Sequence, residues 1–111
     1  MHPFKAEYGM SGRLQNKVAV VTGGASGIGE GIVRRFCAEG AKVILADVDE
    51  ANGPRIASEC GAEFTRLDVS SAQSWQSLES KIRDDKVQLD IMVNNAGVVT
   101  GLDITAVTVE A

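Results

Sequence analysis

A glycine-rich turn after an apolar run constrains the fold of this chain more than any other feature. Residues 22–29 read Thr-Gly-Gly-Ala-Ser-Gly-Ile-Gly and directly follow Val-Ala-Val-Val at residues 18–21. Gly23 allows a tight turn off a strand, Gly27 places no side chain between the backbone and a phosphate, and Gly29 lets the next helix pack closely. The first N–H groups of that helix then face a bound anion. The turn therefore predicts a site for the pyrophosphate of a dinucleotide.

Downstream of the turn, segments typical of strands and of helices alternate. The predicted elements are strands over residues 18–21, 43–46, 63–67 and 89–93, and helices over residues 29–38, about 50–60, and a third segment with Trp75, Leu78 and Ile82 on one face. Strands that alternate with helices indicate a parallel sheet covered on both faces. Right-handed crossovers then favour a doubly wound α/β sheet with the strand order 3-2-1-4.

Two helix starts carry specific signals. Pro54 leaves two alternatives for the second helix. An N-cap at Asn52 would put the proline in the first turn, where it is tolerated, whereas an N-cap at Asp49 would require a kink. Ser70 and Gln73 form an S-x-x-Q pattern, which predicts a capping box at the start of the third helix.

Asp47 lies at the end of the second predicted strand, about 20 residues after the glycine turn. A carboxylate at this place accepts hydrogen bonds from the adenosine ribose hydroxyls, and it repels a 2′-phosphate. Along the chain no basic residue is adjacent to it, since Val48 follows. We therefore expect NAD rather than NADP as the cofactor. The alternative is that Asp47 only caps a helix.

Composition excludes several other classes of protein. The 111 residues carry 11 Lys+Arg and 15 Asp+Glu, a net charge of −4, which argues against nucleic acid as the main partner. No apolar run is long enough to cross a membrane, and the first fifteen residues do not resemble a secretory signal. Cys37 and Cys60 lack metal-ligand spacing and a histidine partner, so we interpret them as packed helix thiols, and we expect no metal site. A cytoplasmic α/β domain is the expectation.

Four motifs in order resemble the short-chain dehydrogenase/reductase family. They are Thr-Gly-x-x-x-Gly-x-Gly at residues 22–29, Asp47, Asp68-Val69, and Asn-Asn-Ala-Gly at residues 94–97. The resemblance covers about residues 13–111. It implies a Rossmann-type fold and a nicotinamide cofactor.

The resemblance also implies a role for each matching position. Ser26 and Ile28 would contribute around the pyrophosphate, and Asp47 would hold the adenosine ribose. Asp68 and Val69 would flank the adenine, and Asn94 would help to tie the strands together. The remaining positions would line the cofactor at the end of the fourth strand: Asn95, Ala96 and Gly97.

The family's catalytic residues have no counterpart in this sequence. The family uses a tyrosine with a lysine four residues later, and a preceding serine, to move a proton while hydride moves to or from the nicotinamide. The only tyrosine is Tyr8, and the residue four positions later is Gly12. The resemblance implies an NAD-dependent oxidoreductase of secondary alcohols and ketones, of which this chain supplies the cofactor-binding part and is inactive alone.

We expect an N-terminal extension over residues 1–14 and a partial Rossmann domain over residues 15–111. Thr108 resembles an N-cap, so the chain is expected to stop where a helix begins, truncated after the fourth strand. A homo-oligomer is expected only for a complete protein, with a small alcohol or ketone as its substrate. Two alternatives remain: a non-catalytic module that binds NAD or a protein partner, and an inactive truncation product.

Overall fold

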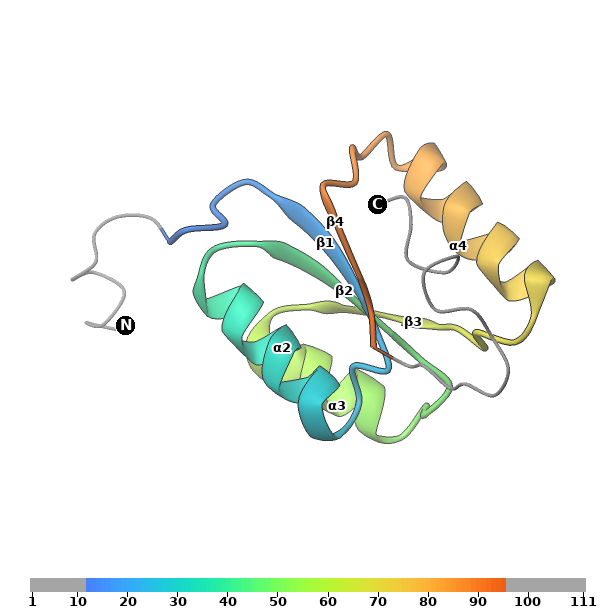
Figure 1. Cartoon of the computed structure of the whole chain (residues 1–111), viewed down its shortest axis with the longest axis horizontal. Coiled ribbons are helices and arrows are strands. Elements are labelled where there is room, and N and C mark those ends of the chain that lie inside the picture. The colour runs from blue at the N-terminus through green and yellow to red at the C-terminus, as the bar shows by residue number, and fades with distance from the viewer. Residues whose placement is uncertain (1–11, 96–111) are drawn as a thin grey trace.

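The computed structural model describes residues 12–95, so the predicted N-cap at Thr108 and most of the predicted N-terminal extension lie outside the described residues. Within this range strands and helices alternate (Figure 1). The elements are β1 (Val18–Thr22), α2 (Gly27–Ala38), β2 (Lys42–Asp47), α3 (Asn52–Cys60), β3 (Glu63–Arg66), α4 (Ala72–Asp84) and β4 (Ile91–Asn94).

The strands form one parallel sheet with the order β3-β2-β1-β4 across the described residues, which confirms the predicted doubly wound topology. Val20 of β1 is in register with Ile44 of β2 on one side and with Met92 of β4 on the other. The chain therefore moves outward from β1 to β3 and then crosses back to place β4 on the opposite side. Such a reversal is the topological switch point at which open α/β sheets bind ligands.

Two apolar layers hold the sheet between its helices. On one face α2 and α3 pack side by side, and on the other face lies α4 (Figure 1). The first layer is centred on buried residues of both helices and the central strands: Val21, Val33, Leu45 and Ile56. The second layer joins α4 to alternate residues of the same strands and to a leucine that follows β3: Leu78, Val20, Ile44 and Leu67. Burial on both faces explains why β1 and β2 are continuous apolar runs.

Helix α3 begins at Asn52, so Pro54 lies in its first turn, where a missing N–H costs no hydrogen bond. The N-cap is Ala51, so neither predicted cap residue holds that position. Asp49 still serves the helix start, because its Oδ1 accepts the N–H groups of Ala51 (3.0 Å) and Asn52 (2.8 Å).

The predicted capping box at Ser70 is wrong by one residue. The N-cap of α4 is Ser71, whose hydroxyl oxygen accepts the N–H of Ser74 at 3.1 Å. Ser70 is unavailable because Oδ1 of Asp68 accepts both its N–H (2.9 Å) and its hydroxyl (2.6 Å). This Asx turn delays the helix, and an aspartate two residues ahead competes with capping in a way that the S-x-x-Q pattern does not include.

The fourth strand starts two residues later than predicted, at Ile91. Asp90 lies outside the strand but still pairs with β1: its N–H donates to the Val18 carbonyl, and its Oδ2 accepts the Val18 N–H, both at 2.9 Å. Among residues 12–95, no helix has the length and apolar character needed to span a membrane. The same part of the chain contains no cluster of side chains suited to a metal ion.

Candidate cofactor-binding site

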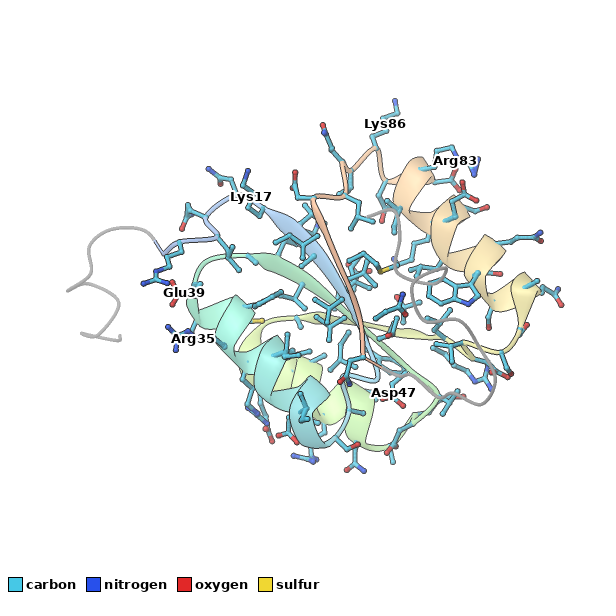
Figure 2. All side chains as sticks on the ribbon, viewed as in Figure 1. Lys17, Arg35, Glu39, Asp47, Arg83 and Lys86 are labelled. Atoms are coloured by element: carbon cyan, nitrogen blue, oxygen red, sulfur yellow. The ribbon has the colours of Figure 1, made fainter. Side chains whose placement is uncertain are left out.

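The glycine turn and Asp47 meet at the carboxyl ends of β1 and β2. The Gly23 N–H donates to the Ala46 carbonyl (2.8 Å), and the Ala25 N–H donates to Oδ2 of Asp47 (3.0 Å). Asp47 lies at the opposite end of the sheet from Lys17, which precedes β1 (Figure 2). The predicted phosphate-binding turn and the predicted ribose-binding carboxylate are thus joined directly.

Residues at the end of β4 contact the glycine turn from the side of β1 opposite β2. The side-chain amide of Asn95 donates to the Gly23 carbonyl (3.1 Å), and the Thr22 hydroxyl lies 3.3 Å from the Val93 carbonyl and 3.5 Å from Oδ1 of Asn94. Two predicted site residues that follow this segment lie outside the described residues: Ala96 and Gly97.

Two of the glycines are required for different reasons. A Cβ at Gly29 would collide with the Gly23 carbonyl oxygen and would come within 2.6 Å of Nδ2 of Asn95, so α2 packs directly on the turn and on the end of β4. Gly27 has a φ of 55°, but a Cβ there would meet nothing within 4 Å. The space in front of Gly27 is therefore open, as a bound phosphate requires.

The start of α2 differs from the other helix starts among the described residues. The N-cap Ser26 forms no side-chain capping hydrogen bond, whereas Asp49 accepts N–H groups at the start of α3 and Ser71 does so in α4. Helix geometry leaves the first N–H groups without intrahelical acceptors. Beside them Ile28 is 76% exposed, one of the largest apolar side chains on the described surface. The start of α2 therefore offers donors and an apolar contact to a ligand.

Asp47 is fixed in place by two backbone donors. Its Oδ2 accepts the Ala25 N–H, and its Oδ1 accepts the Asp49 N–H at 2.9 Å. Each carboxylate oxygen has capacity for a further hydrogen bond. The alternative that Asp47 caps a helix is not the arrangement observed, because Ala25 precedes the N-cap of α2 and Asp49 serves α3.

A basic residue lies beside Asp47 across the sheet, which the sequence did not indicate. Arg66 of β3 is in register with Asp47 of β2. Its guanidinium forms an ion pair with Glu50 at 3.0 Å, and both side chains are largely exposed. Adjacency along the chain therefore underestimates the positive charge near Asp47, although Glu50 offsets it. Only the register of β3 against β2, which pairs residue 46 with residue 65 and Asp47 with Arg66, would have located this basic residue.

Asp68 and Val69 follow β3 at the same carboxyl end of the sheet, but both form hydrogen bonds with residues of α4. The Asp68 N–H donates to the Ser74 hydroxyl (3.2 Å), and the Val69 carbonyl accepts the Trp75 indole N–H (2.9 Å). Hydrogen bonds from the Ser70 hydroxyl and N–H hold the pKa of the Asp68 carboxyl below its ordinary value. These contacts fix the loop on which a predicted adenine-binding surface lies.

Similarity to known proteins identifies the family of this chain. The sequence model of the short chain dehydrogenase family matches residues 17–111, nearly the whole chain. The chain belongs to the short-chain dehydrogenase family. This is a family of oxidoreductases, and membership implies a nicotinamide cofactor.

Individual relatives agree with this membership. The 3-beta-hydroxysteroid dehydrogenase of Comamonas testosteroni is 45% identical over 91 residues, which cover 80% of this chain and 36% of that protein. Galactitol 2-dehydrogenase of Agrobacterium fabrum is 40% identical over 101 residues, 89% of this chain and 40% of its own. A crystal structure of a short chain dehydrogenase from Mycobacterium smegmatis superposes with a TM-score of 0.70 at 30% identity, covering 80% of this chain and 41% of that one. The chain thus spans well under half the length of these relatives.

The described residues fit a dinucleotide. The open space at Gly27 and the start of α2 suit a pyrophosphate, and Asp47 suits ribose hydroxyls, because its oxygens retain acceptor capacity. The nicotinamide cofactor would be held by Gly23, Ser26 and Gly27 at the turn and by Asp47 at the end of β2.

Proposed function

We propose that this chain is the NAD-binding part of an oxidoreductase that transfers hydride between a secondary alcohol or ketone and the nicotinamide. The observation that carries the proposal is the start of α2, which lacks a side-chain cap among the described residues and lies one hydrogen bond from Asp47. Anion binding satisfies such N–H groups, and the helix dipole adds up to about 2 kcal/mol.

The preference for NAD over NADP follows from Asp47. A ribose 2′-hydroxyl donates to a carboxylate, whereas a 2′-phosphate is repelled by it. Arg66 is the one described basic residue in register with Asp47, and its ion pair with Glu50 offsets its charge. The balance of charge around Asp47 therefore favours a ribose that carries no 2′-phosphate.

The proton chemistry of the family requires residues that this sequence lacks. Its only tyrosine is Tyr8, and it contains no Tyr-x-x-x-Lys pattern. We therefore propose that the 111-residue chain binds NAD without turnover, and that the substrate is met by other parts of a complete, oligomeric protein. Relatives named for a hydroxysteroid and for galactitol support an alcohol as the substrate class.

Ser26→Asp tests the proposal at the helix start. An aspartate is a good N-cap, so its carboxylate would satisfy the α2 N–H groups in place of a pyrophosphate and would repel it. We expect an unchanged or higher Tm and an NAD affinity at least about tenfold weaker by equilibrium titration. Ser80→Asp, which adds the same charge at an exposed position of α4, is the control and leaves NAD affinity unchanged.

Two results would contradict the proposal. The first is an unmodified chain that is folded by circular dichroism and does not bind NAD at millimolar concentration. The second is equal NAD affinity in the Ser26→Asp variant and the unmodified chain, because a ligand unaffected by a carboxylate at Ser26 does not use the start of α2.

A further inference from the structure

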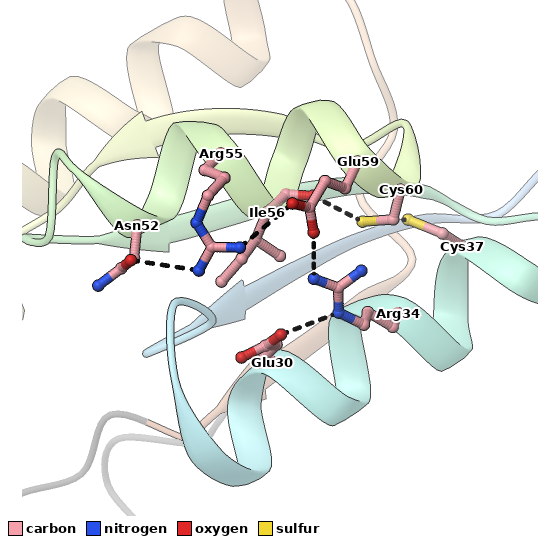
Figure 3. Close-up of polar contacts among 8 residues, drawn as sticks. All are labelled: Glu30, Arg34, Cys37, Asn52, Arg55, Ile56, Glu59 and Cys60. Atoms are coloured by element: carbon pink, nitrogen blue, oxygen red, sulfur yellow. Dashed lines mark hydrogen bonds and ion pairs between the residues drawn. The ribbon is translucent and has the colours of Figure 1, made fainter.

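Two cysteines that are distant in sequence meet between α2 and α3. Cys37 lies in the last turn of α2 and Cys60 is the last residue of α3, and their Sγ atoms are 3.7 Å apart (Figure 3). They are the only cysteines in the chain. Both are half-buried, so each retains some access to solvent.

Other contacts hold the two helices in this arrangement. Arg34 of α2 bridges to Glu59 of α3 at 2.6 Å and to Glu30 of its own helix at 2.9 Å (Figure 3). The Cys37 thiol donates to Sγ of Cys60, and the Cys60 thiol donates to the Ile56 carbonyl at 3.2 Å. The sulfur pair is therefore positioned by the helix packing and by a directed chain of hydrogen bonds.

We propose that Cys37 and Cys60 form a reversible disulfide that links α2 to α3 when the chain meets a hydroperoxide. A disulfide has an S–S distance of about 2.05 Å, so the sulfur atoms must approach by about 1.6 Å from their separation of 3.7 Å. Side-chain rotation at the two residues, together with a small shift of the helices, supplies a movement of this size.

The first attack is assigned to Cys60, because its Sγ accepts the hydrogen of the Cys37 thiol. Burial and the neighbouring Cys60 thiol raise the pKa of Cys37 to about 12, so Cys37 keeps its proton at neutral pH. The Cys60 thiolate attacks one oxygen of hydrogen peroxide and the O–O bond breaks. The released hydroxide takes a proton, which leaves a sulfenic acid on Cys60 and one water.

The second step uses the contact between the two sulfur atoms. Sγ of Cys37 attacks the sulfenic sulfur of Cys60, the S–S bond forms, and the C–S–OH oxygen leaves as a second water with the proton of Cys37. The two thiols together lose two electrons and two protons, and the peroxide is reduced to two waters.

The bond would close a loop that contains β2 and Asp47, and it would lie at the ends of α2 and α3 remote from the glycine turn. We therefore expect it to stabilise the fold around the candidate site without blocking it.

The test is oxidation of the full 111-residue chain under native conditions with stoichiometric hydrogen peroxide. Intact-mass measurement should show a loss of about 2 Da that dithiothreitol reverses, and trypsin should release residues 36–42 linked to residues 56–66. The Tm should rise by about 5–10 °C on oxidation, since a loop of this length is closed in the unfolded chain.

Cys37→Ser and Cys60→Ser are the matched controls. Neither should lose 2 Da or gain stability, and Cys37→Ser should accumulate about 16 Da on Cys60, because the sulfenic acid has no resolving thiol. Disulfide formation should also be at least about tenfold faster in the native chain than in guanidinium, since the fold brings the pair together. Equal rates in the two solvents, or additions of oxygen to the native chain without the 2 Da loss, would overturn the proposal.

Discussion

Asp47→Asn is the substitution that separates the cofactor preference from the stability of the site. Asparagine preserves the size of the side chain but removes its charge and one acceptor oxygen. The carboxylate accepts the Ala25 N–H on Oδ2 and the Asp49 N–H on Oδ1. The asparagine Nδ2 only donates, so the variant can satisfy one of these two N–H groups. Leaving a buried donor unsatisfied costs about 1–3 kcal/mol, and we expect the free energy of unfolding to fall by the lower half of this range, because Asp47 is partly exposed.

The same substitution should change the cofactor preference by more than it changes the free energy of unfolding. Two unit charges at about 4 Å in an effective dielectric of 20 repel by about 4 kcal/mol, and solvent at the end of the sheet reduces this to about 2 kcal/mol. Removing the charge of Asp47 should therefore shift the ratio of NAD to NADP affinity by about 30-fold toward NADP. Part of that shift should be a gain in NADP affinity, because Arg66, although paired with Glu50, no longer has a second carboxylate in register with it.

Equilibrium titration of both cofactors, with the Tm of each variant measured beside it, provides the assay. Adding Arg66→Gln to Asp47→Asn should remove the gain in NADP affinity without restoring NAD binding. Asp84→Asn, an exposed change of the same kind on α4, should leave both affinities unchanged. If Asp47→Asn is folded and its NAD/NADP ratio equals that of the unmodified chain, the carboxylate does not select the cofactor and the reasoning is refuted.

Three further predictions concern stability. Gly29→Ala should lower the free energy of unfolding by at least about 2 kcal/mol in urea titrations, because its Cβ meets the Gly23 carbonyl, whereas Gly31→Ala in the same helix should raise it by about 0.5–1 kcal/mol, because a Cβ there meets nothing within 4 Å. Thr65→Val should stabilise by about 1 kcal/mol, since the buried Thr65 hydroxyl has no hydrogen-bond partner in the described part of the chain. Hydrogen bonds from the start of α3 lower the pKa of Asp49, so its stabilisation is complete above the ordinary carboxyl pKa near 3.9 and is lost as the pH falls through the lowered value. The difference in Tm between the unmodified chain and Asp49→Ala should therefore shrink as the pH is lowered from about 5 to 2, and a difference that grows with acidification would contradict this sign.

The sequence predicted the features that depend on neighbours along the chain. The apolar run before Thr22 reads as a buried strand because β1 is covered on both faces, and the strand order follows from right-handed crossovers. Errors appear where two local signals compete. The Ser70 hydroxyl binds the Asp68 carboxylate, and the cap of α4 passes to Ser71.

Contacts between elements were beyond the same reasoning. Cys37 and Cys60 looked like separate packed thiols, and only the packing of α2 on α3 brings their sulfur atoms to 3.7 Å. Arg66 stands one residue before the end of the predicted third strand, yet its register with Asp47 places a positive charge at the candidate site. Such contacts require the register of the sheet and the orientation of the helices, which patterns of neighbouring residues do not specify.

Departures from local stability rules gather at one place in the described part of the chain. Gly23 and Gly27 have positive φ, the N-cap Ser26 forms no side-chain cap, and Ile28 stands 76% exposed, all within one turn. The starts of α3 and α4 obey the rules, with carboxylate or hydroxyl oxygens on their first N–H groups. Among residues 12–95 the starts of α3 and α4 are capped and the start of α2 is open, which forgoes about 1 kcal/mol at that end. A phosphate would satisfy the open N–H groups and an adjoining ligand surface would cover the isoleucine, so the cost is recovered on binding. We therefore infer that the start of α2 binds a ligand, on grounds independent of any relative.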